Sequence, residues 1–263
     1  MNKYGKFVGL FREFYNEDNI KIDEKLSSYV NFRVGGPADI LLIPESKEQI
    51  KKSICICKEN NIPVYVIGNG SNILVRDGGF RGVVISLKGV HNVTVNDERI
   101  EAECGAMLKE VSDKAMENSL TGFEFACGIP GTIGGAVFMN AGAYDGEIAH
   151  VIESAEVLDE NCNVLKLTND ELDFGYRSSL VMKKGYTVLS AVFKLQKGKV
   201  KTIKDLVNDL THKRESKQPL EYPSAGSTFK RPTGYFAGKL IQDEVKEQFG
   251  VDLHTEVRII GEE

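Results

Sequence analysis

The chain has 263 residues, of which 41% are hydrophobic and 27% charged, and this suits a globular protein of one large domain or two to three small ones. Its net charge of −5 and its lack of a long Lys/Arg run argue against nucleic acid or a membrane surface as the main partner. No apolar stretch approaches the roughly 20 residues that a membrane helix needs. The apolar run Phe7–Phe11 is too short for a signal peptide, so we expect a cytoplasmic protein.

The cysteines and histidines form no recognisable metal-binding pattern. There are five cysteines, an odd number, and no C-x-x-C spacing, which favours free thiols in a reducing compartment. The four histidines lie far apart in the chain, so we expect no structural metal.

The first third of the chain alternates between predicted helices and strands. Phe7, Leu10, Phe11 and Phe14 recur at helical spacing and predict an amphipathic helix. Ser46 is the expected N-cap of a second helix. We expect helices at residues 46–61 and 107–118, and strands at 39–44, 63–67, 73–75, 83–87, 93–95 and 100–104.

Strands dominate the middle of the chain, and a helical segment follows. We expect strands at residues 152–159, 164–168 and 187–194, a linker at 196–199, a helix at 200–214, a loop at 219–234, a second helical stretch and a last strand at 256–261. This order predicts an α+β fold, with divisions at residues 1–79, 80–195 and 196–263.

Two glycine-rich stretches are candidate anion sites. Gly68, Asn69, Gly70, Ser71 and Asn72 follow a buried strand, where backbone N–H groups can turn toward a phosphate. The dinucleotide fingerprint of parallel α/β folds is not matched, because a third glycine is missing and a strand follows. This motif fits either a phosphate cradle or a plain tight turn.

The second stretch has a higher glycine density. Five glycines and one proline fall between Gly128 and Gly142, which we take as poor material for regular helix or sheet. Such a density predicts backbone pressed against a ligand, and two cradles could hold a diphosphate between them. A purely structural turn is the alternative.

Several other polar residues are weak candidates when taken alone. Arg33 precedes a Gly-Gly turn, Arg177 lies in FGYRSS, Ser227 in SAGSTFKRP and Glu256 in TEVR. A surface arginine, a turn serine and a solvated strand glutamate are the ordinary interpretations of such residues. The sequence contains no G-x-S-x-G motif, so a serine hydrolase is not supported.

Taken together, these segments resemble the UDP-N-acetylenolpyruvoylglucosamine reductases (MurB). NFRVGGPAD, VIGNGSNILVRDGGFRGVVI, ACGIPGTIGGAVFMNAGAY, FGYRSS, SAGSTFKRP, GYFAGKLI and TEVRIIGE occur in the family's order, from about Tyr29 to Glu262. The short run after Arg177 is similar to the type II branch. The resemblance implies a two-part FAD-binding domain of the vanillyl-alcohol-oxidase type and a smaller C-terminal α+β substrate domain.

The resemblance also implies roles for individual residues. Arg177, Ser227 and Glu256 match the catalytic positions. Tyr176, Arg214, Lys217, Lys239 and Arg258 match positions that line the nucleotide or substrate site. The implied set around non-covalent FAD is Arg33, Gly68, Asn69, Gly70, Ser71, Asn72, Gly128, Pro130, Gly131, Thr132, Gly134, Gly135, Asn140 and Gly142.

The implied reaction takes hydride from NADPH through FAD to the small-molecule substrate UDP-N-acetylglucosamine enolpyruvate, for peptidoglycan precursor synthesis. Hydride adds at C3, while Arg177 and Glu256 stabilise charge at C2 and the carboxylate, an effect of roughly 3–4 kcal/mol for each oriented group. Ser227 then protonates C2. We expect a monomer.

One segment departs from the family. Asp243 runs directly into Glu244, where the family has a sizeable insertion that completes the substrate domain. A module this short has little core of its own, which bears on substrate affinity more than on FAD binding. Two alternatives stay open: another FAD oxidoreductase of the same fold, and a flavin-binding protein inactivated by the shortened module.

Overall fold

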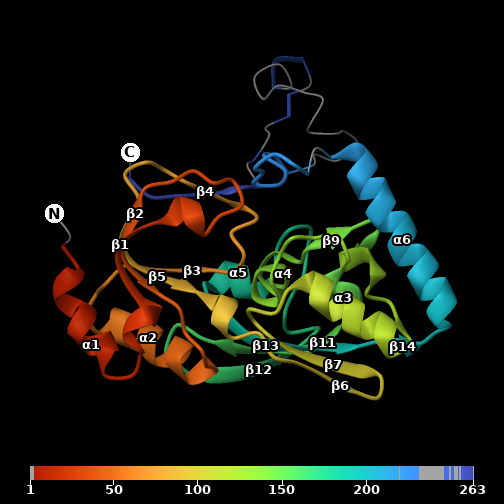
Figure 1. Cartoon of the computed structure of the whole chain (residues 1–263), viewed down its shortest axis with the longest axis horizontal. Helices are drawn as coiled ribbons and strands as arrows, with labels where there is room; N and C mark the ends of the chain where they lie inside the picture. Colours follow the sequence, from red (N-terminus) through yellow and green to blue (C-terminus); the bar gives the residue numbers. More distant parts are fainter. Residues whose placement is uncertain are drawn as a thin grey trace.

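The computed structural model describes residues 3–218, 220–230, 246–248, 250–251, 254 and 256–262. Two larger sheets form its framework. The first lies toward the N-terminus, on the left of Figure 1, and the second runs beneath helices α3 (Leu108–Glu117) and α4 (Ile133–Met139).

The central strands of the first sheet are buried on both faces. Its spatial order is β1 (Ile20–Lys25), β2 (Pro37–Leu42), β5 (Phe80–Ser86) and β3 (Val64–Ile67). β1 is antiparallel to β2, whereas β2 and β3 run parallel to β5. Ile40 and Leu42 pack with α1 (Val8–Arg12) and α2 (Lys47–Glu59), while Leu41 faces a separate core cluster. Burial on both faces explains the continuous apolar run of β2.

Helix α2 confirms the predicted start signal. Ser46 has extended backbone geometry, and its hydroxyl accepts a hydrogen bond from the Gln49 N–H at 3.2 Å. Ile50 and Cys57 are buried, and Ile54 packs beside them, so the predicted apolar face is the one that covers the sheet.

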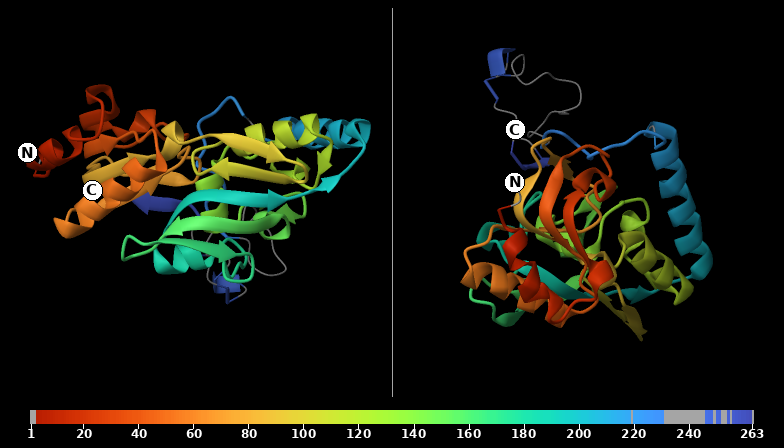
Figure 2. Two further views of the ribbon diagram at one scale, coloured as in Figure 1. Left: turned by 90° about the horizontal axis from the view of Figure 1, so that it is seen from below. Right: turned by 60° about the vertical axis from the view of Figure 1, so that its left-hand side comes forward.

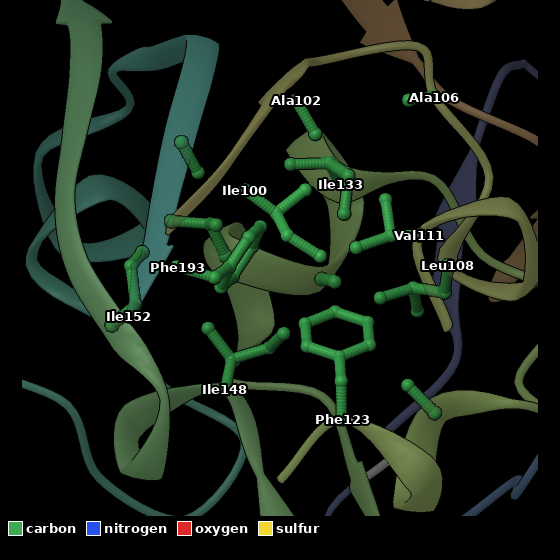
Figure 3. Close-up of a cluster of buried hydrophobic side chains, with 14 of the residues drawn as sticks. Ile100, Ala102, Ala106, Leu108, Val111, Phe123, Ile133, Ile148, Ile152 and Phe193 are labelled. Atoms are coloured by element: carbon green, nitrogen blue, oxygen red, sulfur yellow. The ribbon is translucent and has the colours of Figure 1, made fainter. Parts of the chain in front are cut away.

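The second sheet is antiparallel throughout. Its order is β12 (Val164–Thr168), β11 (Ile152–Leu158), β13 (Thr187–Lys194), β7 (Arg99–Glu103) and β6 (Val93–Asn96). The left view of Figure 2 shows these strands side by side. Helices α3 and α4 pack on one face and form the largest core cluster, in which Phe123 and Phe193 meet edge to face at 4.9 Å (Figure 3).

Sheet membership suggests where the two halves divide. We expected a boundary between residues 79 and 80, but β5 lies between β2 and β3 and so groups with the first sheet. We propose a division near the short 3₁₀ turn Leu87–Gly89, just before β6. Across it, the Lys47 ammonium of α2 donates to Glu156 at 2.8 Å and to Ser190 at 2.9 Å.

The C-terminal segments return to the two halves. Helix α6 (Val200–Lys217) lies against α3 and the 3₁₀ turn Glu124–Ala126, with Ile203 and Leu210 buried (Figure 1). Strand β15 (Arg258–Ile260) pairs in parallel with β4 (Ile73–Val75). Because β4 directly follows the first glycine turn, this pairing brings the end of the chain to that turn.

Several features differ from the sequence-based expectations. The second glycine stretch was expected to be poor helix material, which is wrong over Ile133–Met139: buried Ile133, Ala136 and Val137 hold α4 against the core, and this packing outweighs the low propensity of glycine. Strand β1 and helix α5 (Leu180–Lys184) were not predicted. The expected linker at residues 196–199 instead begins with strand β14 (Gln196–Lys197), which is held by antiparallel pairing with β8 (Leu120–Thr121). The junction of Asp243 and Glu244 lies outside the described residues.

Phe193→Ala should lower the free energy of unfolding by about 3–5 kcal/mol, because Phe193 is fully buried against Phe123. Urea unfolding followed by circular dichroism measures this change. Leu206→Ala on exposed α6 is the control, with an expected change within about 0.5 kcal/mol. Equal effects of the two substitutions would contradict the core described here.

Candidate functional site

A cavity of about 1150 Å³ lies between the two glycine stretches and the returning C-terminal segments. It exceeds the roughly 300–1,000 Å³ that small-molecule sites usually occupy, which leaves room for a dinucleotide. The predicted site residues that line it are Arg33, Ser71, Asn72, Gly128, Pro130, Gly142, Arg177, Arg214, Ser227 and Glu256.

The first glycine turn is held against the segment that carries Arg33. Gly70 has φ +65°, a conformation that a glycine adopts without strain, and its Cα face touches Tyr29 and Val30. The Gly70 carbonyl accepts a hydrogen bond from Asn31 N at 3.0 Å. Arg33 itself is left-handed, with φ +57°. These contacts keep Arg33 and the turn on one wall of the cavity.

The two glycine stretches contact each other directly. Asn69 Nδ2 donates to the Pro130 carbonyl at 2.8 Å, and Gly68 lies so close to Thr132 Oγ1 that a Cβ there would overlap it. Thr132 is 1% exposed, and its hydroxyl has no hydrogen-bond partner among the described residues. Since buried hydroxyls are normally paired, this one is a candidate contact for a bound group.

Arg177 projects from a tight turn into the cavity. Gly175 and Ser178 exchange two backbone hydrogen bonds around it, and Arg177 adopts φ +50°. Its Nη2 donates to the Gly142 carbonyl at 2.9 Å, and its Nε to Glu256 Oε1 at 3.3 Å. The Tyr176 ring lies 5.2 Å from the guanidinium carbon.

Glu256 is fixed by backbone contacts on both sides. Its N–H donates to the Thr228 carbonyl at 2.9 Å, and its carbonyl accepts from Asn72 Nδ2 at 3.0 Å. Burial raises the pKa of the carboxyl above its usual value, although Arg177 and Lys230 act in the opposite direction. The carboxyl therefore holds a proton more readily than an exposed glutamate does.

Ser227 lies on the loop that carries Thr228, and it lines the same cavity as Arg177 and Glu256. The neighbouring Gly226 packs near the Ser71 carbonyl and Asn72 Oδ1. The structure thus brings together the three predicted catalytic residues, which come from three distant parts of the chain.

Other predicted site residues lie behind or beside the lining. Gly134 donates to the Cys104 carbonyl at 2.8 Å, and Arg258 stacks over the Phe138 ring at 5.3 Å. Lys239 falls outside the described residues. The predicted residues that are described but do not line the cavity are Gly68, Asn69, Gly70, Gly131, Thr132, Gly134, Gly135, Asn140, Tyr176, Lys217 and Arg258.

Sequence reasoning missed part of the lining. Further lining residues include Ser27, Ser28, Asn31, Met139, Gln218, Leu220 and Tyr222. Their only signal is position within or near the motifs: Asn31 and Met139 lie inside quoted motifs, and the others lie close to NFRVGG or SAGST without any spacing of their own. In the described part of the chain, no cluster of three or more His, Cys, Asp or Glu could hold a metal ion, and no helix is long and apolar enough to cross a membrane.

Residues 38–168 match a family model described as "FAD binding domain". The chain is 54% identical over 302 positions to UDP-N-acetylenolpyruvoylglucosamine reductase of Clostridium perfringens (strain 13 / Type A), covering 99% of both chains. It is 51% identical over 304 positions to the enzyme of Clostridium botulinum (strain Alaska E43 / Type E3), covering 100% of both. The chain belongs to the UDP-N-acetylenolpyruvoylglucosamine reductase family.

Solved structures agree with this family and with its fold. The MurB structure from Thermus caldophilus is 28% identical, with a TM-score of 0.76 over 91% of this chain and 99% of that one. An alkyldihydroxyacetonephosphate synthase is 20% identical, with a TM-score of 0.57 over 74% of this chain and 41% of that one, and shows only the shared fold. These likenesses confirm the predicted α+β flavoprotein architecture.

The chain is shorter than its relative from Clostridium perfringens. An alignment of 302 positions against a chain of 263 residues leaves at least 39 positions of the Clostridium perfringens protein without a counterpart here. This agrees with the shortening expected from the sequence. Despite these missing positions, the residues named above line the cavity.

Thr132→Val should weaken FAD binding by about 10-fold while leaving the free energy of unfolding of the apoprotein within about 1 kcal/mol. The Thr132 hydroxyl makes no hydrogen bond to the described protein and does not cap α4, so valine costs the fold little. Titration of apoprotein with FAD, followed by flavin fluorescence, measures the affinity. Thr94→Val on exposed β6 is the control; unchanged affinity in Thr132→Val would show that the hydroxyl does not serve the cofactor.

Glu256→Gln should become more favourable to stability, relative to the wild type, as pH rises. Burial raises the pKa of Glu256 in the folded protein. The carboxyl's contribution to the free energy of unfolding of the wild type is therefore fully present below the unfolded-state pKa of about 4.3, and it is lost as pH rises through the folded-state pKa. Urea unfolding of both proteins at several pH values across this window gives the difference. A difference that does not change with pH would contradict the raised pKa.

Proposed function

We propose that this chain reduces UDP-N-acetylglucosamine enolpyruvate to UDP-N-acetylmuramate, with FAD as cofactor and NADPH as reductant. The observation that carries the proposal is the Arg177–Glu256 pair in a large cavity beside both glycine stretches, in a chain of the MurB family. Ser227 lines the same cavity.

The residues present fit FAD. The contacting stretches 68–72 and 128–135 carry the glycines that would let the backbone approach a diphosphate closely, and the Thr132 hydroxyl has no hydrogen-bond partner among the described residues. Arg33 adds a positive charge at the cavity wall that suits a diphosphate. When bound, FAD supplies the relay of a hydride from NADPH to the substrate.

Arg177 and Glu256 receive the carboxylate of the enolpyruvyl group. The Arg177 side chain is aimed by two carbonyls and by Glu256, so its charge is oriented before substrate arrives. Burial raises the pKa of the Glu256 carboxyl, and a proton taken up there as the substrate carboxylate arrives would remove a like-charge repulsion. As charge builds at C2 and the carboxylate, the guanidinium stabilises it.

Ser227 supplies the proton to C2 after hydride has added at C3. Ser227 lines the cavity and lies on the loop that is anchored to the Glu256 backbone. Arg214 lies against Gly128, since its Cδ would be 2.7 Å from a Cβ there, and we propose that it binds the diphosphate of the nucleotide. Lys217, Lys239, Tyr176 and Arg258 complete the proposed substrate site.

We also propose that the protein is a cytoplasmic monomer serving peptidoglycan synthesis, and that residues 196–263 form the substrate module. A second candidate function is FAD binding without turnover, which the at least 39 unmatched positions favour. A yellow protein that fails to oxidise NADPH in the presence of substrate would support this second candidate.

The direct test is NADPH oxidation by FAD-loaded protein. Oxidation should require UDP-N-acetylglucosamine enolpyruvate, and mass spectrometry should find a product heavier by two hydrogen atoms. Oxidation at one rate with and without this substrate, and no such product, would refute the proposal.

Ser227→Ala should leave reduction of FAD by NADPH near the wild-type rate and slow the reoxidation by substrate about 10²-fold or more. The serine is needed only to protonate C2, a step that the first half-reaction lacks. Anaerobic stopped-flow absorbance separates the two halves, with Ser216→Ala on α6 as the control. Equal slowing of both halves would mean that Ser227 is structural.

A further inference from the structure

We propose that Asn140 is a positioning residue for Arg177, in addition to whatever contact its loop makes with FAD. The inference rests on the proposed function only in that Arg177 is the group whose position matters. Asn140 ends helix α4, and its side chain is fully buried and does not line the cavity.

Both ends of the Asn140 amide are used within the protein. Nδ2 donates to the Gly175 carbonyl at 3.1 Å, and Oδ1 accepts from Ala149 N at 3.0 Å. The Gly175 carbonyl also accepts the Ser178 N–H that closes the turn around Arg177. The side chain of Asn140 therefore grips the base of the Arg177 turn.

The backbone of Asn140 holds the other end of the same arginine. Its carbonyl accepts a hydrogen bond from Arg177 Nη1 at 3.3 Å, next to the bond from Nη2 to Gly142. This carbonyl points toward Arg177 because the backbone of Asn140 is left-handed, with φ +48°. Asparagine and aspartate tolerate that conformation better than most residues with a Cβ.

A second bond protects the turn from the opposite side. Ser179 Oγ donates to the Phe138 carbonyl at 2.6 Å, so residues on both sides of Arg177 are tied to the end of α4. Because Arg177 itself sits at φ +50°, loss of the Asn140 contact lets the turn relax and the guanidinium drift. Drift weakens the 3.3 Å contact with Glu256.

The test compares asparagines that make similar hydrogen bonds. Asn140→Ala removes the grip on the turn. Asn140→Gly also removes both side-chain hydrogen bonds, accepts the positive φ without strain and adds no charge near Glu256, and it is the variant to use if the alanine fails to fold. Asn169→Ala is the matched control, since Asn169 Nδ2 donates to the Ala149 and Ile152 carbonyls at 2.8 and 2.9 Å without touching Arg177.

The first readout is the titration of Glu256 in the FAD-loaded protein, by NMR of ¹³C-labelled glutamate, with the signal assigned through Glu256→Gln. Arg177 lowers the pKa of Glu256, so its drift in the Asn140 variants should move that pKa further upward. The second readout is anaerobic stopped-flow: reoxidation by the enolpyruvyl substrate should slow about 10–100-fold, with FAD reduction by NADPH little changed. Asn169→Ala should change neither readout.

An unmoved Glu256 titration in the Asn140 variants, or an equal shift in Asn169→Ala, would overturn the inference. Equal slowing of both half-reactions would also overturn it, because that is the result of a general structural defect. If the wild type does not turn over this substrate, the proposed function fails, yet the titration still decides the role of Asn140.

Discussion

The parallel pairing of β15 with β4 is the contact on which the site depends. It delivers Glu256 to Arg177, which precedes it by 79 residues, and it does so beside the first glycine turn. Asn72 contacts the chain on both sides of Val257. Its side-chain Nδ2 donates to the Glu256 carbonyl, and its backbone carbonyl accepts a hydrogen bond from Arg258 N at 2.9 Å. Without this pairing, Arg177 would lose its acidic partner and the cavity would lose one wall.

Some of the positions with a strained backbone lie at or beside this cavity. Arg33, Asn140 and Arg177 all have positive φ, a conformation that costs a residue with a Cβ free energy unless its surroundings hold it. Bonds across the site provide that support, among them Asn69 to Pro130 and Arg177 to Gly142. The cavity walls are therefore shaped before any ligand arrives, as expected for a site that works by oriented charge.

Local signals in the sequence were sufficient for much of the framework. The Ser46 cap, the strand at Ile73–Val75 and the alternating strands of the second sheet follow from capping and periodicity. Helix α4 could not be predicted this way, because its burial against the second sheet is a tertiary effect. Likewise, no local pattern pairs Arg177 with Glu256. The resemblance to the family indicated both residues as catalytic candidates, and only the structure shows that they are in contact, at 3.3 Å.

The claim that Arg177 and Glu256 act as one unit is tested most directly by a double-mutant cycle. Arg177→Lys, Glu256→Gln and the double variant are compared by the rate at which UDP-N-acetylglucosamine enolpyruvate reoxidises the reduced flavin. Because the side chains are in contact, the account predicts an interaction free energy of about 1 kcal/mol or more between the two substitutions. Effects that add to within about 0.3 kcal/mol would contradict it.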